Sequence, residues 1–284
     1  MANSSMKLTL HIGMPRTGTT AIQDYLYSLG QTVSPIVSQR GHPELIMLGG
    51  TPRALNEFSR RFGPVTPERI LALKEALRSA ETDHVVLSSK MLYEFSDAEF
   101  IGNLCVELDD IFDEIRVIVY FRHQIDHFPL LVTQRVKAGM KDWAQIIKVP
   151  DAIYRYDEIC ALWDQDVDVI ARDYGRCKDD VIGDFCAAVG LPVPEVTVAR
   201  RPHPTLDARA LKLLLLINSS SAPSKDSVRR RIADELEGLT LSKQTFKIGR
   251  DLADEIAERF EAGNQRLSEQ YLGGLALLRQ TEKR

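Results

Sequence analysis

The sequence lacks most of the features that would place it in a specialised class of protein. Only 4 of its 284 residues are cysteine, and none has C-x-x-C spacing, which argues against a disulfide framework or a zinc site. No apolar run approaches membrane-spanning length, and the first residues do not resemble a secretion signal. A net charge of −4 gives no sign of a general nucleic-acid or membrane surface. We therefore expect a cytoplasmic, bacterial-type protein with no nucleic-acid partner and no integral membrane segment.

Most of the chain alternates between strand-like apolar runs and amphipathic segments. Hydrophobic residues make up 44% and charged residues 27% of the sequence, as in soluble globular proteins. This alternation predicts an α/β protein, a three-layer fold in which helices flank a central parallel sheet. We expect a single domain over 1–284, with a helical C-terminal part from about residue 206. Expected strands cover 8–12, 85–89, 115–121 and 167–174, with an edge strand at 32–37; expected helices cover 52–62, 66–80, 97–111, 124–138, 151–164, 177–189 and 250–272.

The most informative stretch is GMPRTGTT at residues 13–20, which lies between the first strand and a helical pattern that opens at Ala21. A strand, a tight glycine loop and a helix N-terminus bind phosphate-like anions, because backbone N–H groups point into the loop and the helix dipole favours negative charge. The plainer alternative is a glycine turn that binds no ligand. We favour the anion site because an amphipathic helix follows the loop directly.

The loop has the glycine spacing G-x-x-x-x-G-K-[ST] but not its lysine. Thr19 occupies the lysine position, and Arg16 is the only cation in the loop. Hydrolysis of ATP or GTP is therefore disfavoured, since that lysine normally reaches the terminal phosphates. A P-loop kinase that uses ATP and magnesium is kept as an alternative, although no aspartate follows the strand at 115–121.

Two other predicted strands end at cationic residues. Arg122 follows the strand at 115–121, and Lys90 follows the strand that ends in Ser88 and Ser89. Ligands of parallel sheets bind at the carboxyl ends of the strands, so both cations are expected at the rim that carries the glycine loop. Arg122 is interpreted as a fork-like donor to a second phosphate group. The alternative is an arginine that caps the strand end with its head in water.

The loop resembles that of the sulfotransferases, whose usual form is P-K-[ST]-G-T-T, with Arg16 in the lysine position. The segment VIVYFRHQIDHFPLLVTQRVKAG is similar to the second cofactor motif of bacterial capsular-polysaccharide-type sulfotransferases. Arg122, Gln124 and Gln134 match that motif, whereas Leu130 replaces a serine that would help to hold the 3′-phosphate. Thr133 lies about one helical turn further along. The resemblance extends, in order, over about residues 7–275.

This resemblance implies a P-loop-type fold and a reaction that depends on 3′-phosphoadenosine 5′-phosphosulfate (PAPS). A sulfuryl group would pass to a hydroxyl or amine of an unidentified acceptor, a small molecule or a glycan, without a metal. Arg16 would stabilise the charge that develops on the leaving oxygen. The residues implied for the nucleotide are Pro15, Arg16, Thr17, Gly18, Thr19, Thr20, Arg122 and Lys90.

The reaction also needs a base for the proton of the acceptor. His42 is the first candidate, because neutral imidazole suits that role near pH 7, and Glu94 is the second. Their alternatives are a surface histidine and a solvated carboxylate. Arg16, Leu130 and Lys90 depart from the family pattern, so a catalytically impaired nucleotide-binding member of the fold is a further alternative. The sequence does not predict an oligomeric state.

Overall fold

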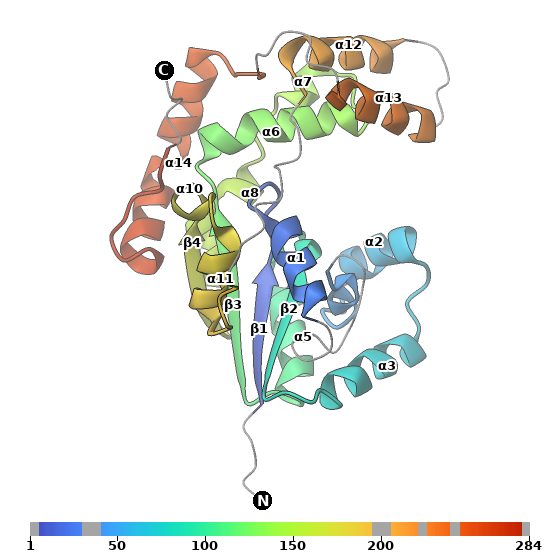
Figure 1. Ribbon diagram of the computed structural model, residues 1–284, viewed down its shortest axis with the longest axis vertical. Coiled ribbons are helices and arrows are strands. Elements are labelled where there is room, and N and C mark those ends of the chain that lie inside the picture. The colour runs from blue at the N-terminus through green and yellow to red at the C-terminus, as the bar shows by residue number, and fades with distance from the viewer. Residues whose placement is uncertain (1–5, 30–40, 195–205, 221–225, 239–244, 280–284) are drawn as a thin grey trace, which may run out of the picture. The chain divides into compact units, whose positions relative to one another are not determined.

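The computed structural model describes residues 6–29, 41–194, 206–220, 226–238 and 245–279 (Figure 1). Four strands form one sheet in the order β2-β1-β3-β4, and all neighbouring pairs are parallel. The predicted parallel sheet, with the strand at 115–121 in its interior, is confirmed. The expected edge strand at 32–37 lies outside the described residues. The strands are β1 (Lys7–Ile12), β2 (His84–Ser89), β3 (Glu114–Phe121) and β4 (Asp168–Asp173).

Helices follow or connect these strands, and their positions largely agree with the prediction. The bounds are α1 (Thr19–Ser28), the 3-10 helix η2 (Pro43–Met47), α2 (Pro52–Phe62), α3 (Pro67–Arg78), α4 (Lys90–Glu94), α5 (Ala98–Asp109), α6 (Gln124–Lys137), α7 (Trp143–Ile146), α8 (Asp151–Tyr154), α9 (Tyr156–Trp163), α10 (Tyr174–Cys177), α11 (Val181–Val189), α12 (Ala208–Ser219), α13 (Asp226–Gly238) and α14 (Arg250–Tyr271).

The prediction differed from the structure in several places, and it did not include the short helices η2, α7 and α10. The expected helix at 151–164 is divided into α8 and α9, because Arg155 has a non-helical ψ of 71°. The expected helix at 177–189 begins only at Val181, where the Asp180 side chain accepts from Gly183 N and caps α11. The short helix α4, directly after β2, was not predicted at all.

The chain forms two compact units. The first comprises residues 1–122, 155–199 and 263–278, and it contains the whole sheet. The second comprises residues 123–154, 200–262 and 279–284, with α6, α7, α8, α12 and α13. Helix α14 begins in the second unit and ends in the first.

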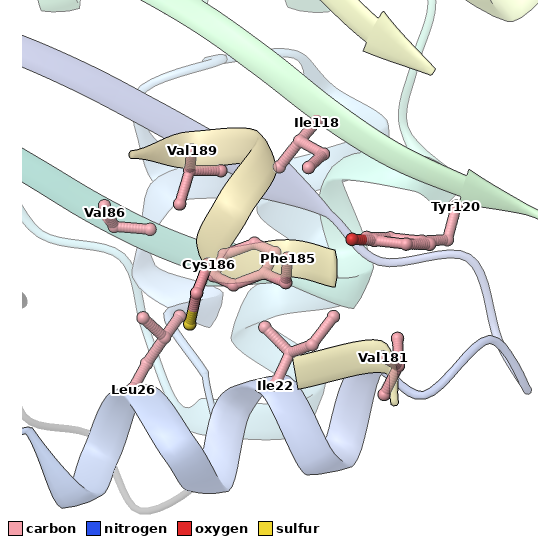
Figure 2. Packing of buried hydrophobic residues seen from close by; sticks show 9 residues of the cluster. All are labelled: Ile22, Leu26, Val86, Ile118, Tyr120, Val181, Phe185, Cys186 and Val189. Carbon is pink, nitrogen blue, oxygen red and sulfur yellow. The ribbon is translucent and has the colours of Figure 1, made fainter. Parts of the chain in front are cut away.

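The first unit has the predicted three layers. Helices α1 and α11 cover one face of the sheet, and Figure 2 shows their side chains directed toward those of β2 and β3. The opposite face is covered by α9, where the Tyr156 ring stacks on Phe121 with centroids 4.5 Å apart. The first face buries one continuous core, made of Ile22, Leu26, Val86, Ile118, Tyr120, Val181, Phe185, Cys186 and Val189.

In the second unit, buried polar side chains join helices to one another. Asn218 of α12 donates through Nδ2 to the carbonyl of Val136, at 2.7 Å. The His127 ring of α6 shares a 2.8 Å hydrogen bond between Nδ1 and the Tyr154 hydroxyl. The Tyr154 ring also meets Phe260 edge-on. These contacts give His127 a packing role inside the unit.

Candidate functional site

The loop between β1 and α1 is shaped by two left-handed residues, Arg16 with φ 65° and Gly18 with φ 78°. A Cβ on Gly18 would lie 3.3 Å from Cε2 of Tyr174, and one on Gly13 would lie 2.3 Å from Cγ2 of Thr19. Both glycines are therefore needed for the close packing of this loop. Arg16 adopts a conformation that non-glycine residues rarely take, and such strain gathers at functional loops.

Helix α1 presents its N-terminus directly after the loop. Gly18 is the residue before the helix, and it supplies no side-chain cap. The first N–H groups of a helix have no acceptor within the helix, and the helix dipole adds partial positive charge there. The first turn of α1 contains no acidic residue. The amides at this end are therefore suited to an external anion.

Two threonine hydroxyls fix the interior of the loop. Thr17 Oγ1 donates to the Met14 carbonyl at 2.8 Å, and Thr19 Oγ1 donates to the same oxygen at 3.0 Å. Both side chains are buried. Thr17 and Thr19 were predicted to contact the nucleotide; their hydroxyls bind within the loop, so a contact of that kind would come from their backbone amides.

Strand β2 brings a cation to the loop. The Gly13 amide donates to the Ser89 carbonyl at 3.2 Å, which joins the start of the loop to the end of β2. The next residue, Lys90, donates from Nζ to Oγ1 of Thr20 at 3.1 Å. The structure thus brings together Lys90 and Thr20, which the sequence places 70 residues apart.

Arg122 and the same loop are both close to one aromatic side chain, that of Tyr174. The guanidinium carbon of Arg122 is 5.7 Å from the ring centroid of Tyr174, and that ring borders Gly18. The Tyr156 hydroxyl donates to the Arg122 carbonyl at 2.8 Å, which holds the backbone where β3 ends. The three strand ends of β1, β3 and β4 therefore meet around Tyr174. Burial raises the pKa of its hydroxyl, and the Arg122 charge opposes that effect.

A buried polar group lies two residues before the loop. The His11 ring shares a 2.8 Å hydrogen bond between Nδ1 and Oγ of Ser88, and Gln23 donates to that oxygen at 3.1 Å. Burial, together with a smaller effect of the nearby charge of Lys90, lowers the pKa of His11 to about 3. His11 is therefore neutral at any physiological pH. It links β1, β2 and α1 beneath the loop.

His42, the first predicted base, is bound to the backbone of β2. Its Nδ1 accepts from the Ser88 amide at 3.0 Å, and its own amide donates to the Ser88 carbonyl at 2.7 Å. The side chain is buried. The same Nδ1 also lies 3.3 Å from the Ser88 carbonyl, so this ring nitrogen is occupied by the backbone of β2.

Glu94, the second predicted base, ends α4. Its carboxylate lies 3.7 Å from Arg61 of α2, and its carbonyl accepts from Arg53 at 3.2 Å. Burial raises the pKa of this carboxyl, and Arg61 lowers it by a smaller amount. Glu94 is four residues after Lys90, so both lie on one face of the short helix.

Two residues of the second cofactor motif lie on α6, in the second unit. The Thr133 hydroxyl donates to the carbonyl of Pro129 at 2.9 Å, within its own helix. Gln124 donates to the carbonyl of Tyr154 at 3.1 Å. Thr133 therefore uses its proton locally, and Leu130 has no polar group to offer in place of the serine.

Sequence reasoning missed Tyr174 and His11. Tyr174 had a usable signal, because it follows β4 at the same sheet edge as Arg122 and Lys90. His11 had none, since a histidine inside a strand is indistinguishable from a surface residue until the partner strands are known. In the part of the chain that is described, no three His, Cys, Asp or Glu side chains gather as a metal site, and no helix is long and apolar enough to cross a bilayer.

Comparisons with known proteins give distant similarities. No protein-family model matches the chain, and no curated protein matches it. The sulfotransferase domain from the Synechococcus PCC 7002 olefin synthase is 13% identical, with a TM-score of 0.36 over 90% of this chain and 95% of that one. The sulfotransferase domain from the curacin biosynthetic pathway is 10% identical, with a TM-score of 0.38 over 90% of this chain and 97% of that one. Similarity at this level does not assign a function, so the site geometry must support the proposal.

Proposed function

We propose that this protein transfers a sulfuryl group from PAPS to a hydroxyl or amine of an acceptor. The observation that supports it best is a pair of anion-binding points at one sheet edge. One is the glycine loop with the N-terminus of α1, the other is Arg122, and the Tyr174 ring lies close to both. A nucleotide with one acidic group at its 5′ end and a second at its 3′ position matches such a pair.

The loop residues fit the 5′-phosphosulfate. The amides of the first turn of α1 would donate hydrogen bonds to its oxygens, and the Arg16 guanidinium and the Lys90 ammonium would supply positive charge. Arg122 would hold the 3′-phosphate through its fork of N–H donors.

When bound, the nucleotide would supply an activated sulfuryl group. The acceptor oxygen or nitrogen forms a bond to sulfur, and the bond from sulfur to the bridging oxygen breaks. The electron pair of that bond stays on the 5′-phosphate, and the acceptor proton passes to a base. The positioned donors of the loop stabilise the charge that grows on the bridging oxygen, and they need no rearrangement to do so.

Of the two predicted bases, Glu94 fits the proton transfer better. His42 uses its Nδ1 lone pair for the Ser88 amide. Burial raises the pKa of Glu94, which makes its carboxylate a stronger base. Glu94→Gln should lower turnover with little change in nucleotide affinity. Glu57→Gln is the matched control, because Glu57 also pairs with Arg61. An equal loss of turnover in both variants would show that turnover depends on the ion pairs with Arg61 and not on Glu94 as a base.

The binding half of the proposal is tested by calorimetric titration with 3′-phosphoadenosine 5′-phosphate and, separately, with ATP and magnesium. We expect the bisphosphate to bind more tightly, and Arg16→Ala to abolish sulfuryl transfer while the fold is retained. Preference for the magnesium nucleotide would instead support a kinase, and binding of neither would indicate a fold that has lost its ligand. The polysaccharide-type acceptor stays a prediction, to be examined with glycan and small-molecule acceptors.

A further inference from the structure

Lys90 and Thr20 meet at the carboxyl edge of the sheet. Strands β1 and β2 are parallel neighbours, with Ile12 opposite Ser89, so the segments after them leave the sheet at the same level. Lys90 follows Ser89 directly, and its ammonium donates to the Thr20 hydroxyl at 3.1 Å. Thr20 is the second residue of α1.

The place of Thr20 in the loop gives this contact a chemical meaning. In the spacing G-x-x-x-x-G-K-[ST], the hydroxyl two residues after the second glycine binds Mg²⁺. Gly18 is the second glycine here, and Thr20 holds that hydroxyl. An ammonium group therefore lies against the oxygen that a metal-dependent loop offers to its cation.

The lysine position of the same spacing is also altered. Thr19 stands there, and its hydroxyl is turned to the Met14 carbonyl. The loop thus has no lysine of its own, and the neighbouring strand supplies one. The charge of Lys90 also acts on His11, which is buried below the loop, and contributes to lowering its pKa.

We propose that Lys90 takes the place of the divalent cation, and thereby makes anion binding at this loop independent of metal. This inference rests on the proposed function and deepens it, because it makes Lys90 a specificity-determining residue. A terminal sulfuryl group carries less charge than a terminal phosphoryl group, so one ammonium suffices for it. A triphosphate, which normally binds with its magnesium, meets a cation already in place and is disfavoured.

The test measures nucleotide affinity by calorimetry in buffer with EDTA and in buffer with magnesium. Wild-type protein should bind 3′-phosphoadenosine 5′-phosphate equally in both. Lys90→Met keeps the length of the side chain but removes the charge, and it should weaken binding about tenfold or more in EDTA. Magnesium should restore part of that loss, because the Thr20 hydroxyl becomes accessible to the ion.

Lys7→Met is the matched control. Lys7 lies at the other end of β1 and pairs with Glu114 at 2.5 Å. This variant removes the same charge from the same sheet and should bind like the wild type. Lys90 is exposed, so its replacement is expected to leave the fold intact.

The outcomes separate this inference from the proposed function. A wild-type requirement for magnesium, or a Lys90→Met variant indistinguishable from wild type in both buffers, would overturn the role of Lys90. If only ATP binds, the sulfuryl-transfer proposal fails, and so does the claim that Lys90 disfavours a triphosphate; the same two buffers with ATP then decide whether Lys90 makes binding independent of metal. If neither nucleotide binds the wild-type protein, both proposals fail.

Discussion

The guanidinium carbon of Arg122 lies 5.7 Å from the ring centroid of Tyr174, and the same ring borders Gly18 of the glycine loop. One aromatic side chain therefore lies close to both proposed anion-binding points. Its position is fixed by the chain, because Tyr174 is the first residue after β4. We expect this ring to help set where the Arg122 guanidinium lies relative to the loop.

Replacing Tyr174 by alanine should weaken binding of the bisphosphate about fivefold, since Arg122 loses the surface that orients it and a cation–π contact contributes roughly 1 kcal/mol. Tyr174→Phe keeps the ring and should bind like the wild type. Calorimetry on both variants measures the effect. A phenylalanine variant as weak as the alanine variant would shift the role from the ring to the hydroxyl.

A Gly13→Ala substitution should distort the loop, because its Cβ would lie 2.3 Å from Cγ2 of Thr19. We expect a loss of stability of about 1–3 kcal/mol and a large loss of nucleotide affinity. Adding Thr19→Ser removes the clashing methyl group but retains the hydroxyl for the Met14 carbonyl, and it should recover part of both losses. Urea unfolding and calorimetry give the two quantities, and an absence of any recovery would point to a different cause.

The left-handed backbone at Arg16 predicts opposite effects on stability and binding. Glycine adopts φ 65° without strain, whereas alanine and arginine do not. Arg16→Gly should therefore be more stable than Arg16→Ala by about 1 kcal/mol, while both lose affinity for the anion. The comparison of urea midpoints decides the point. Equal midpoints would mean that the loop relaxes when the arginine is removed.

His11 predicts a loss of stability in acid. Its pKa falls from 6.5 in the unfolded chain to about 3 in the fold, so below pH 6.5 the unfolded state binds a proton that the folded state does not. The free energy of unfolding should decrease by about 1.4 kcal/mol per pH unit between these values, and be unaffected by His11 above pH 6.5. His11→Asn keeps a partner for Ser88 and removes the titration. The difference between wild type and variant in the free energy of unfolding, measured against pH, isolates the effect of His11. Identical pH dependence in the two proteins would contradict this prediction.

Most of the sheet could be predicted, because buried parallel strands are continuous apolar runs and those at 85–89 and 115–121 lie between clear helical patterns. Helix α4 could not, because Lys90 continues directly from β2 without a glycine or proline to mark the change. The division at Arg155 was also invisible, since the apolar pattern continues from α8 into α9. A change of direction in the chain leaves no trace in that pattern.

The site was predictable where it is local in sequence, and not where it depends on tertiary contacts. The glycine loop can be recognised from the spacing of its glycines. The rule that ligands bind at the carboxyl ends of parallel strands indicated Arg122 and Lys90 as candidate binding residues. The sequence could not show that Lys90 meets Thr20, or that Thr19 turns its hydroxyl to Met14. Those contacts depend on side-chain directions, which are set only when β2 pairs with β1.

The shared acceptor of Thr17 and Thr19 bears on how quickly a ligand is captured. Two hydroxyls donate to the Met14 carbonyl within the protein itself, so the proposed anion-binding loop has its conformation before any ligand binds. A ligand then spends little of its binding free energy on ordering the chain. Capture should proceed in one kinetic phase, at a rate proportional to ligand concentration and limited by encounter and orientation rather than by a slow closing of the loop.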